Sequence, residues 1–324
     1  MNGRRDARRR PSAGGLHRGL RTWLARLAAA GKTGAPAAQP YAVHDLRIAD
    51  NGPLAARAAH PGEACLVDVD LPDCRWFGAS CLAYSPDGPH PYVRTLVEFD
   101  AGHRAYEGSY IEAYWRTWTP PHQAAYLGLE PRHAHPRLLE TPPLHAALPW
   151  ADANVADLLG RRRWHERADY RRLLESGCPP ARSCGPKPDW FGRERFARLV
   201  ELHTAIASGG YHAVDPAAVT PGSEPIVGSC LVRGVEVRVL VLDGQHRAAA
   251  LAALGHPRTT VLLHVPRRGV PAWTDRDAVR DWPLVRAGLF CERDALAVFD
   301  RVFDALPPPE VRALAAQRPT APAR

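Results

Sequence analysis

The sequence predicts an α+β protein in which a smaller α+β domain precedes a C-terminal α/β domain. The clearest evidence is the stretch 237–264, whose pattern is typical of a strand, a tight turn, a helix and a second strand. An apolar, β-branched run at 64–69 predicts a strand in the first half, and the apolar spacing within 192–208 predicts a long amphipathic helix in the second half. With 324 residues, the chain is long enough for two hydrophobic cores.

The stretch 237–264 divides into four parts. Val237–Leu242 is apolar and rich in β-branched residues, as expected for a buried strand. Asp243 and Gly244 form a turn pair, because glycine reaches backbone angles that other side chains disfavour. Gln245–Leu254 consists largely of the strong helix formers alanine and leucine, and Thr259–His264 predicts the second strand.

The chemistry of this stretch lies at the turn. A helix that begins at Gln245 has backbone N–H groups without intrahelical partners and a partial positive charge at its start. Gly244 permits close approach of an anion, while His246 and Arg247 add donors, and arginine can bind phosphate through two hydrogen bonds. The pattern predicts a phosphate site. The alternative is structural: Asp243 caps the helix, Arg247 pairs with a surface carboxylate, and His246 packs inside.

The same residues carry a resemblance to a known family. The sequence DGQHR at 243–247, followed by Ala250 and the pair Leu254-Gly255, resembles the G-x-H-R-x-x-A core of the ParB/sulfiredoxin superfamily. That superfamily includes nucleotide-binding partition proteins, sulfiredoxins and ATP- or ADP-dependent free-serine kinases. The resemblance covers 191–264, where a predicted helix and two further segments precede the turn in the family's order. It implies a ParB/sulfiredoxin-like domain whose turn holds nucleotide phosphates.

The resemblance also implies roles for individual residues. The Asp-Gly-x-His-Arg form is most similar to the small-molecule kinases, which bind ATP or ADP phosphates with Mg²⁺. ATP, or another nucleotide, and Mg²⁺ are therefore the expected cofactors. Gly244, Gln245, His246 and Arg247 would hold the phosphates. Asp243 would contact Mg²⁺ or fix the turn.

Glu194 is the second expected catalytic residue. It stands near the start of the helix predicted at 192–208, and free-serine kinases carry a catalytic glutamate in a similar place. The resemblance implies that its carboxylate takes a proton from an acceptor hydroxyl. The alternative is a glutamate that the helix dipole favours at a helix start.

Departures from the family patterns narrow the function. Gln245 stands where sulfiredoxins need a cysteine, which disfavours sulfinate reduction. Helices predicted after residue 266 are unlike a helix-turn-helix, which disfavours DNA partition. The expected function is a phosphotransferase acting on a small hydroxyl compound. The segment 281–303, with 191–206, is similar to uncharacterised ParB-like proteins often associated with surface-polysaccharide gene clusters, which implies a glycan precursor. The alternatives are a non-catalytic nucleotide- or anion-binding regulatory module, and a nuclease for which the sequence offers no metal site.

The net charge of +8 is concentrated at the N-terminus. Residues 1–32 contain nine lysines and arginines and one acid, which accounts for the whole excess, so the remainder is balanced. We therefore expect no specific nucleic-acid partner. Leu16–Ala30 has the spacing of a basic amphipathic helix, which would permit peripheral membrane contact, and the favoured alternative is a disordered tail or a start site placed too far upstream. No apolar run reaches the ~18–20 residues of a membrane span.

Cysteine usage indicates a reducing compartment. The seven cysteines are odd in number, contain no C-x-x-C and match no zinc spacing, so we expect buried thiols in a cytoplasmic protein. His133 and His135 form an H-x-H without a cysteine or carboxylate at metal-ligand spacing. The sequence therefore predicts no metal site.

Five segments are expected along the chain. They are a basic tail and linker at 1–40, an α+β domain at 41–130, a Pro-rich connection with a charged helix at 131–190, the ParB/sulfiredoxin-like domain with C-terminal helices at 191–305, and a disordered tail at 306–324.

Further elements are expected within these segments. The residues 93–99 predict a strand, and 106–118 predict a helix whose aromatic stripe belongs to the core rather than to a ligand site. Residues 154–175, 276–285 and 292–305 predict helices.

Overall fold

The chain divides into two units, Met1–Pro40 and Tyr41–Arg324, and every element below belongs to the second. The expectations for the tail and linker at 1–40, and for most of the charged helix at 154–175, fall outside the residues that the computed structural model describes. The described residues are 42–47, 52–78, 81–144, 147–152, 168–179, 181–211, 214–219, 225–263 and 269–318.

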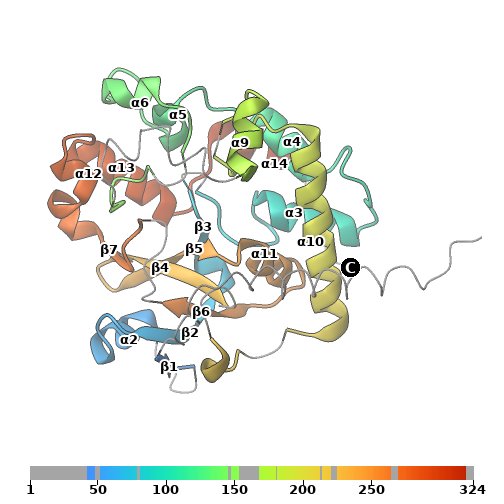
Figure 1. Cartoon of the computed structure of the whole chain (residues 1–324), viewed down its shortest axis with the longest axis horizontal. Coiled ribbons are helices and arrows are strands. Elements are labelled where there is room, and N and C mark those ends of the chain that lie inside the picture. Colours follow the sequence, from blue (N-terminus) through green and yellow to red (C-terminus); the bar gives the residue numbers. More distant parts are fainter. Residues whose placement is uncertain are drawn as a thin grey trace, which may run out of the picture. The chain divides into compact units, whose positions relative to one another are not determined.

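A mixed seven-stranded sheet lies at the centre of this unit (Figure 1). Its strands are β1 (Val43–Asp45), β2 (Ala64–Asp70), β3 (Cys74–Trp76), β4 (Ile226–Arg233), β5 (Glu236–Asp243), β6 (Arg258–Leu263) and β7 (Trp273–Asp275). They lie in the order β1-β2-β6-β4-β5-β3, and β7 pairs with β4 beside this row. β4 is antiparallel to β5 and parallel to β6, while β2 is antiparallel to β6. The protein is therefore of the mixed α+β type. The strands predicted at 64–69, 237–242 and 259–264 are confirmed, the last ending at Leu263.

The stretches 41–130 and 191–305, expected to form separate domains, contribute to the same sheet. β2 pairs with β6 and β3 pairs with β5, so strands of the first stretch flank three strands of the second. Local alternation of apolar residues shows that a strand exists, but not which strand it will pair with. The two stretches therefore lie in one compact unit, Tyr41–Arg324, and the structure places no domain boundary between them.

Helices surround this sheet. They are α2 (Pro53–Ala59), α3 (Pro91–Asp100), α4 (Tyr110–Thr117), α5 (Gln123–Leu127), α6 (Pro136–Glu140), α9 (Ala168–Glu175), α10 (Asp189–Gly209), α11 (Gln245–Ala253), α12 (Pro283–Arg286), α13 (Glu292–Phe303) and α14 (Pro309–Gln317), with 3₁₀ turns η1 (Leu71–Asp73), η2 (Pro216–Ala218) and η3 (Arg276–Asp281). In Figure 1, α3, α10 and α11 lie together to the right of the sheet, and α12 and α13 lie above its left part. The long helix predicted at 192–208 is confirmed as α10, which packs against α11 and α3.

The aromatic stripe of α4 belongs to the core, as predicted. Tyr110, Ile111, Tyr114 and Trp115 are almost completely buried. Large aromatic side chains supply much apolar area per residue, so this short helix anchors the neighbouring α3 and α10.

The strand predicted at 93–99 is wrong, because these residues form α3. Two capping features at its start explain the helix. Pro91 occupies the first turn, where its missing N–H costs nothing, and the His90 Nδ1 accepts a hydrogen bond from the Tyr92 N–H at 3.2 Å. A short apolar run does not distinguish a buried strand from a buried helix by periodicity alone.

Two expectations near the C-terminus also differ from the structure. Residues 309–317, predicted to be disordered, form α14, because Val311 and Leu314 bury apolar side chains in the core. The single helix predicted at 276–285 is divided into η3 and α12, because Pro283 starts a new helical turn and lacks the N–H that would continue the first.

All seven cysteines lie among the described residues. None forms a disulfide, and six are buried, which confirms the expectation of buried thiols. Among the described helices, none combines the length and apolar character that a membrane span requires.

A buried arginine joins the sheet to the C-terminal helices. Arg75 in β3 is 5% exposed, and its Nε donates to the carbonyl oxygens of Val302 at 3.1 Å and Phe303 at 3.0 Å. Its Nη2 also donates to the Phe303 oxygen at 2.8 Å, and its Nη1 to the Pro72 oxygen at 2.7 Å. The last carbonyls of α13 have no intrahelical partners, so the guanidinium takes that role. Burial lowers the Arg75 pKa to about 10, which leaves the group charged at neutral pH.

We expect Arg75→Met to lower the free energy of unfolding by about 3 kcal/mol, because it removes the two N–H donors that the guanidinium gives to the buried Phe303 oxygen. Urea unfolding followed by tryptophan fluorescence measures this change. The matched control is Arg132→Ala, whose exposed side chain pairs with Glu130 and whose loss should cost at most about 1 kcal/mol. Equal effects of the two substitutions would show that Arg75 does not cap α13.

Candidate functional site

The site is built on the turn between β5 and α11. Gly244 has φ +77°, a left-handed conformation that favours glycine, and a Cβ at this position would lie 3.0 Å from the Ile226 Cα. The Ala248 N–H donates the first hydrogen bond of the helix, to the Gly244 oxygen at 3.0 Å. The amides from Gln245 onwards therefore precede the helical ladder, and the positive end of the helix dipole lies at the turn.

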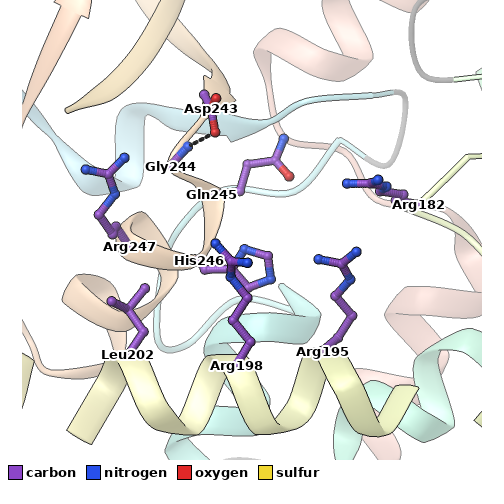
Figure 2. Close-up of a pocket in the computed structure, with 9 residues that line it drawn as sticks. All are labelled: Arg182, Arg195, Arg198, Leu202, Asp243, Gly244, Gln245, His246 and Arg247. Atoms are coloured by element: carbon purple, nitrogen blue, oxygen red, sulfur yellow. Dashed lines mark hydrogen bonds between the residues drawn. The ribbon is translucent and has the colours of Figure 1, made fainter. Parts of the chain in front are cut away.

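The helix α10 runs beside this turn and contributes cations to it. Arg195, Arg198 and Leu202 recur at intervals of three and four residues, so their side chains share one face of α10. Figure 2 shows Arg195 and Arg198 extending from α10 toward the turn, with Arg182 entering from the loop before the helix. Together with the turn they enclose a cleft of about 270 Å³. The cleft is lined by Arg182, Arg195, Arg198, Leu202, Asp243, Gly244, Gln245, His246 and Arg247.

The cleft is strongly positive. Its described lining holds four arginines and one carboxylate, Asp243. The Asp243 Oδ1 accepts a hydrogen bond from the Gly244 N–H at 2.7 Å, so this carboxylate fixes the turn. The Arg247 Nη2 donates to the Pro225 oxygen at 3.4 Å, and the Arg195 guanidinium lies 4.8 Å from the centre of the Phe191 ring. These contacts restrict the arginine side chains, which lowers the conformational entropy lost when an anion binds.

Hydrogen bonds to Ser183 hold the loop that carries Arg182. The Tyr114 hydroxyl donates to the Ser183 oxygen at 2.7 Å, and the Tyr126 hydroxyl lies 2.5 Å from the Ser183 Oγ. All three residues are buried. The aromatic core of α4 and α5 therefore positions an arginine of the cleft.

His246 is neutral in this site. Its ring stacks on Tyr92 with centroids 4.9 Å apart, and its Nε2 is buried without a hydrogen-bond partner among the described residues. Burial is the main cause that lowers its pKa to about 3, and the charges of Arg195, Arg198 and Arg182 act in the same direction. The positive charge of the cleft therefore comes from the arginines, while His246 offers a neutral ring.

Two hydrogen bonds within the protein hold the Gln245 side chain. Its Oε1 accepts a hydrogen bond from the Trp76 Nε1 at 3.0 Å, and its Nε2 donates to the Val241 oxygen at 3.2 Å. These bonds tie the start of α11 to β3 and β5. Gln245 still lines the cleft, and its backbone N–H lies at the start of α11.

Glu194 does not line the cleft. Its carboxylate lies 3.6 Å from the Arg172 Nη1, and its side chain is 59% exposed. One residue along an α-helix turns the side chain by about 100°, so Glu194 leaves the face on which Arg195 lies. The structure thus brings Asp243, Gly244, Gln245, His246 and Arg247 together and leaves Glu194 outside this set.

The sequence expectations omitted four lining residues, namely Arg182, Arg195, Arg198 and Leu202. The spacing of Arg195 and Arg198 predicts that both side chains lie on one face of the helix, and this was the feature of the sequence that could have identified them. It did not indicate that this face of α10 would meet a turn some fifty residues later.

Comparisons with known proteins identify no relative: no family model, curated protein or solved structure matches this chain.

The low pKa of His246 predicts a pH-dependent stability. In the unfolded chain a histidine titrates near pH 6.5, so below that pH the unfolded state binds a proton that the folded state rejects. This destabilisation by His246 is absent above about pH 6.5 and grows as the pH falls toward 3. At pH 5 it lowers the free energy of unfolding by about 2 kcal/mol.

We therefore expect His246→Phe, which keeps a ring against Tyr92, to lose less stability than the wild type between pH 7 and pH 5. Urea unfolding at both pH values measures the difference. His90 also has a pKa of about 3, so part of the pH dependence will remain. The control is His256→Asn, at an exposed position, which should behave as the wild type. An unchanged pH dependence in His246→Phe would mean that this histidine is protonated in the folded protein.

Proposed function

We propose that the cleft binds the phosphoryl groups of a small molecule, with a nucleotide such as ATP as the leading candidate. The observation that supports it most directly is the convergence of four arginines on the N-terminal end of α11. Guanidinium groups match phosphate oxygens in geometry, and the helix dipole adds to their attraction. The likeness of the turn to the ParB/sulfiredoxin superfamily points to the same ligand class.

The size of the cleft limits what it encloses. At about 270 Å³ it lies slightly below the ~300–1,000 Å³ typical of pockets for drug-sized ligands. A cleft of this volume suits a di- or triphosphate group, while a nucleoside or sugar would extend over its rim. The arginines would then supply most of the affinity, and the group beyond the phosphates would supply specificity.

We expect Arg198→Ala and Arg247→Ala each to weaken ATP binding by about 10–100-fold. This is the loss of affinity that corresponds to the free energy of one hydrogen bond between charged groups. Isothermal titration calorimetry with ATP and with pyrophosphate measures the loss. Arg193→Ala is the matched control, because Arg193 lies on the same helix but pairs with Glu107 outside the cleft. If Arg198→Ala binds as tightly as Arg193→Ala, the arginine cleft is not the phosphate site.

Phosphoryl transfer is the second candidate function, favoured by the presence of Asp243 among the lining residues. A hydroxyl oxygen of the acceptor would attack the γ-phosphorus, the bond to the β-phosphate oxygen would break, ADP would leave, and Asp243 would accept the hydroxyl proton. Mg²⁺ usually binds one or two carboxylates together with phosphate oxygens. Asp243 could supply one such ligand, and the ion would add charge neutralisation. A sugar or glycan precursor is the acceptor class that the resemblance suggests.

The position of Glu194 makes this candidate testable. We expect Asp243→Asn to abolish ADP release from Mg²⁺-ATP with pooled sugars and amino acids, and Glu194→Gln to leave it within about twofold. The amide introduced by Asp243→Asn would still offer an oxygen to the Gly244 N–H, so the turn should survive, and ATP binding serves as the control for it. Loss of turnover in Glu194→Gln alone would restore the assignment of Glu194 as the base.

Binding without turnover in the wild type would instead favour a regulatory module that senses a nucleotide or another anion. Both functions suit a cytoplasmic protein, where nucleotides are abundant and free thiols stay reduced. Neither requires a nucleic-acid partner. Contact of residues 1–32 with a membrane stays a separate prediction, which liposome binding of a chain lacking them would test.

A further inference from the structure

A second group of side chains gathers at the β1 edge of the sheet. His44 lies in β1, His60 follows the end of α2, and Glu63 lies in the loop that leads into β2. One potential ligand atom from each residue lies within 4.8 Å of the other two. None of these residues lines the arginine cleft.

The backbone holds the three residues in place. β1 pairs in parallel with β2, with His44 opposite Cys65, which fixes His44 beside the approach to β2. The His60 N–H donates to the Ala56 oxygen at 3.0 Å, and the Glu63 N–H donates to the His60 oxygen at 3.2 Å. The convergence therefore follows from strand pairing and a hydrogen-bonded loop, and does not depend on long side chains alone.

The side chains meet at one carboxylate oxygen. The His60 Nδ1 lies 3.4 Å from the Glu63 Oε2, and the His44 Nε2 contacts the same oxygen. The two imidazole rings stack with centroids 3.7 Å apart. The site is partly accessible, because the side chains of His44, His60 and Glu63 are 36%, 28% and 56% exposed.

We propose that His44, His60 and Glu63 bind a divalent transition-metal ion, with Zn²⁺ as the best match. Two imidazole nitrogens and one carboxylate oxygen form a common zinc ligand set, in which water completes a tetrahedron. Ligand atoms about 2.1 Å from a tetrahedral ion are roughly 3.4 Å apart, which is the separation of the His60 and Glu63 atoms. The His44 ring must move away from Glu63 to reach the same spacing, and its exposure leaves room for that movement. Mg²⁺ and Ca²⁺ prefer oxygen ligands and fit this set poorly.

An ion at this place would act on the edge of the sheet. β1 has three residues and forms an edge of the sheet, so few hydrogen bonds hold it. An ion bound to His44, His60 and Glu63 would fasten β1 to the loop between α2 and β2. Metal binding would then stabilise the folded conformation of β1 and would not take part in chemistry in the arginine cleft.

The test uses the full chain without an affinity tag, stripped of metal by a chelator, and with Cys291→Ser to remove the exposed thiol as a competing ligand. Titration of Zn²⁺ against a chromophoric chelator should show one equivalent bound with a dissociation constant in the micromolar range or tighter. The double substitution His44→Asn and His60→Asn should weaken this binding at least tenfold. The matched control, His133→Asn with His135→Asn, removes a surface histidine pair elsewhere and should bind as before.

Co²⁺ provides a second readout, because a four-coordinate site gives a more intense visible absorption than a hexa-aqua ion. Glu63→Gln gives a milder variant should the double substitution fail to fold, and it should also weaken Zn²⁺ binding. Zinc binding that is equal in the wild type, the double variant and Glu63→Gln would overturn the proposal. Wild-type binding no tighter than millimolar would overturn it as well.

Discussion

The candidate site depends on positive charge that is concentrated at the start of α11. Arg182, Arg195, Arg198 and Arg247 are brought together beside a helix dipole of the same sign. Like charges a few ångströms apart repel by about 1–4 kcal/mol, depending on how well water screens them. The same field acts on His246, whose pKa falls to about 3 under burial and these charges. The fold must therefore hold the arginines in place through contacts made elsewhere.

Those contacts come from the apolar side of α10 and from the aromatic core. Phe196 and Leu199 are buried on the helix that carries Arg195 and Arg198, so packing fixes the direction in which the arginines extend. The turn itself is tied to β3 by the bond from Trp76 to Gln245. Because the charge repels itself, a bound polyanion should stabilise the folded protein by relieving that repulsion as well as by forming new hydrogen bonds.

The sequence predicts those parts of the structure that local patterns determine. The strand, the left-handed glycine and the helix at 237–254 follow from neighbouring residues, so they were predicted almost residue for residue. The pairing of β2 with β6 joins residues nearly two hundred positions apart, and no local pattern contains that information. For the same reason the sequence identified the turn but not the arginines of α10 that meet it. Glu194 shows the converse limit: the resemblance assigns a base to this helix, and the helical turn directs the Glu194 side chain toward Arg172 and away from the cleft.

The distribution of charge also bears on whether the cleft binds or catalyses. Arginines that contact phosphates equally in the substrate and in the transition state lower the free energy of both, which increases affinity without increasing the rate of the chemical step. Catalysis of transfer additionally needs a group that accepts the proton of the incoming hydroxyl, and Asp243 is the carboxylate in the described lining. That carboxylate accepts a hydrogen bond from the Gly244 N–H through its Oδ1, which fixes its position beside the turn. Phosphate binding therefore draws on several residues of the cleft, whereas transfer would depend on this one carboxylate, whose Oδ2 is not used in the bond to Gly244.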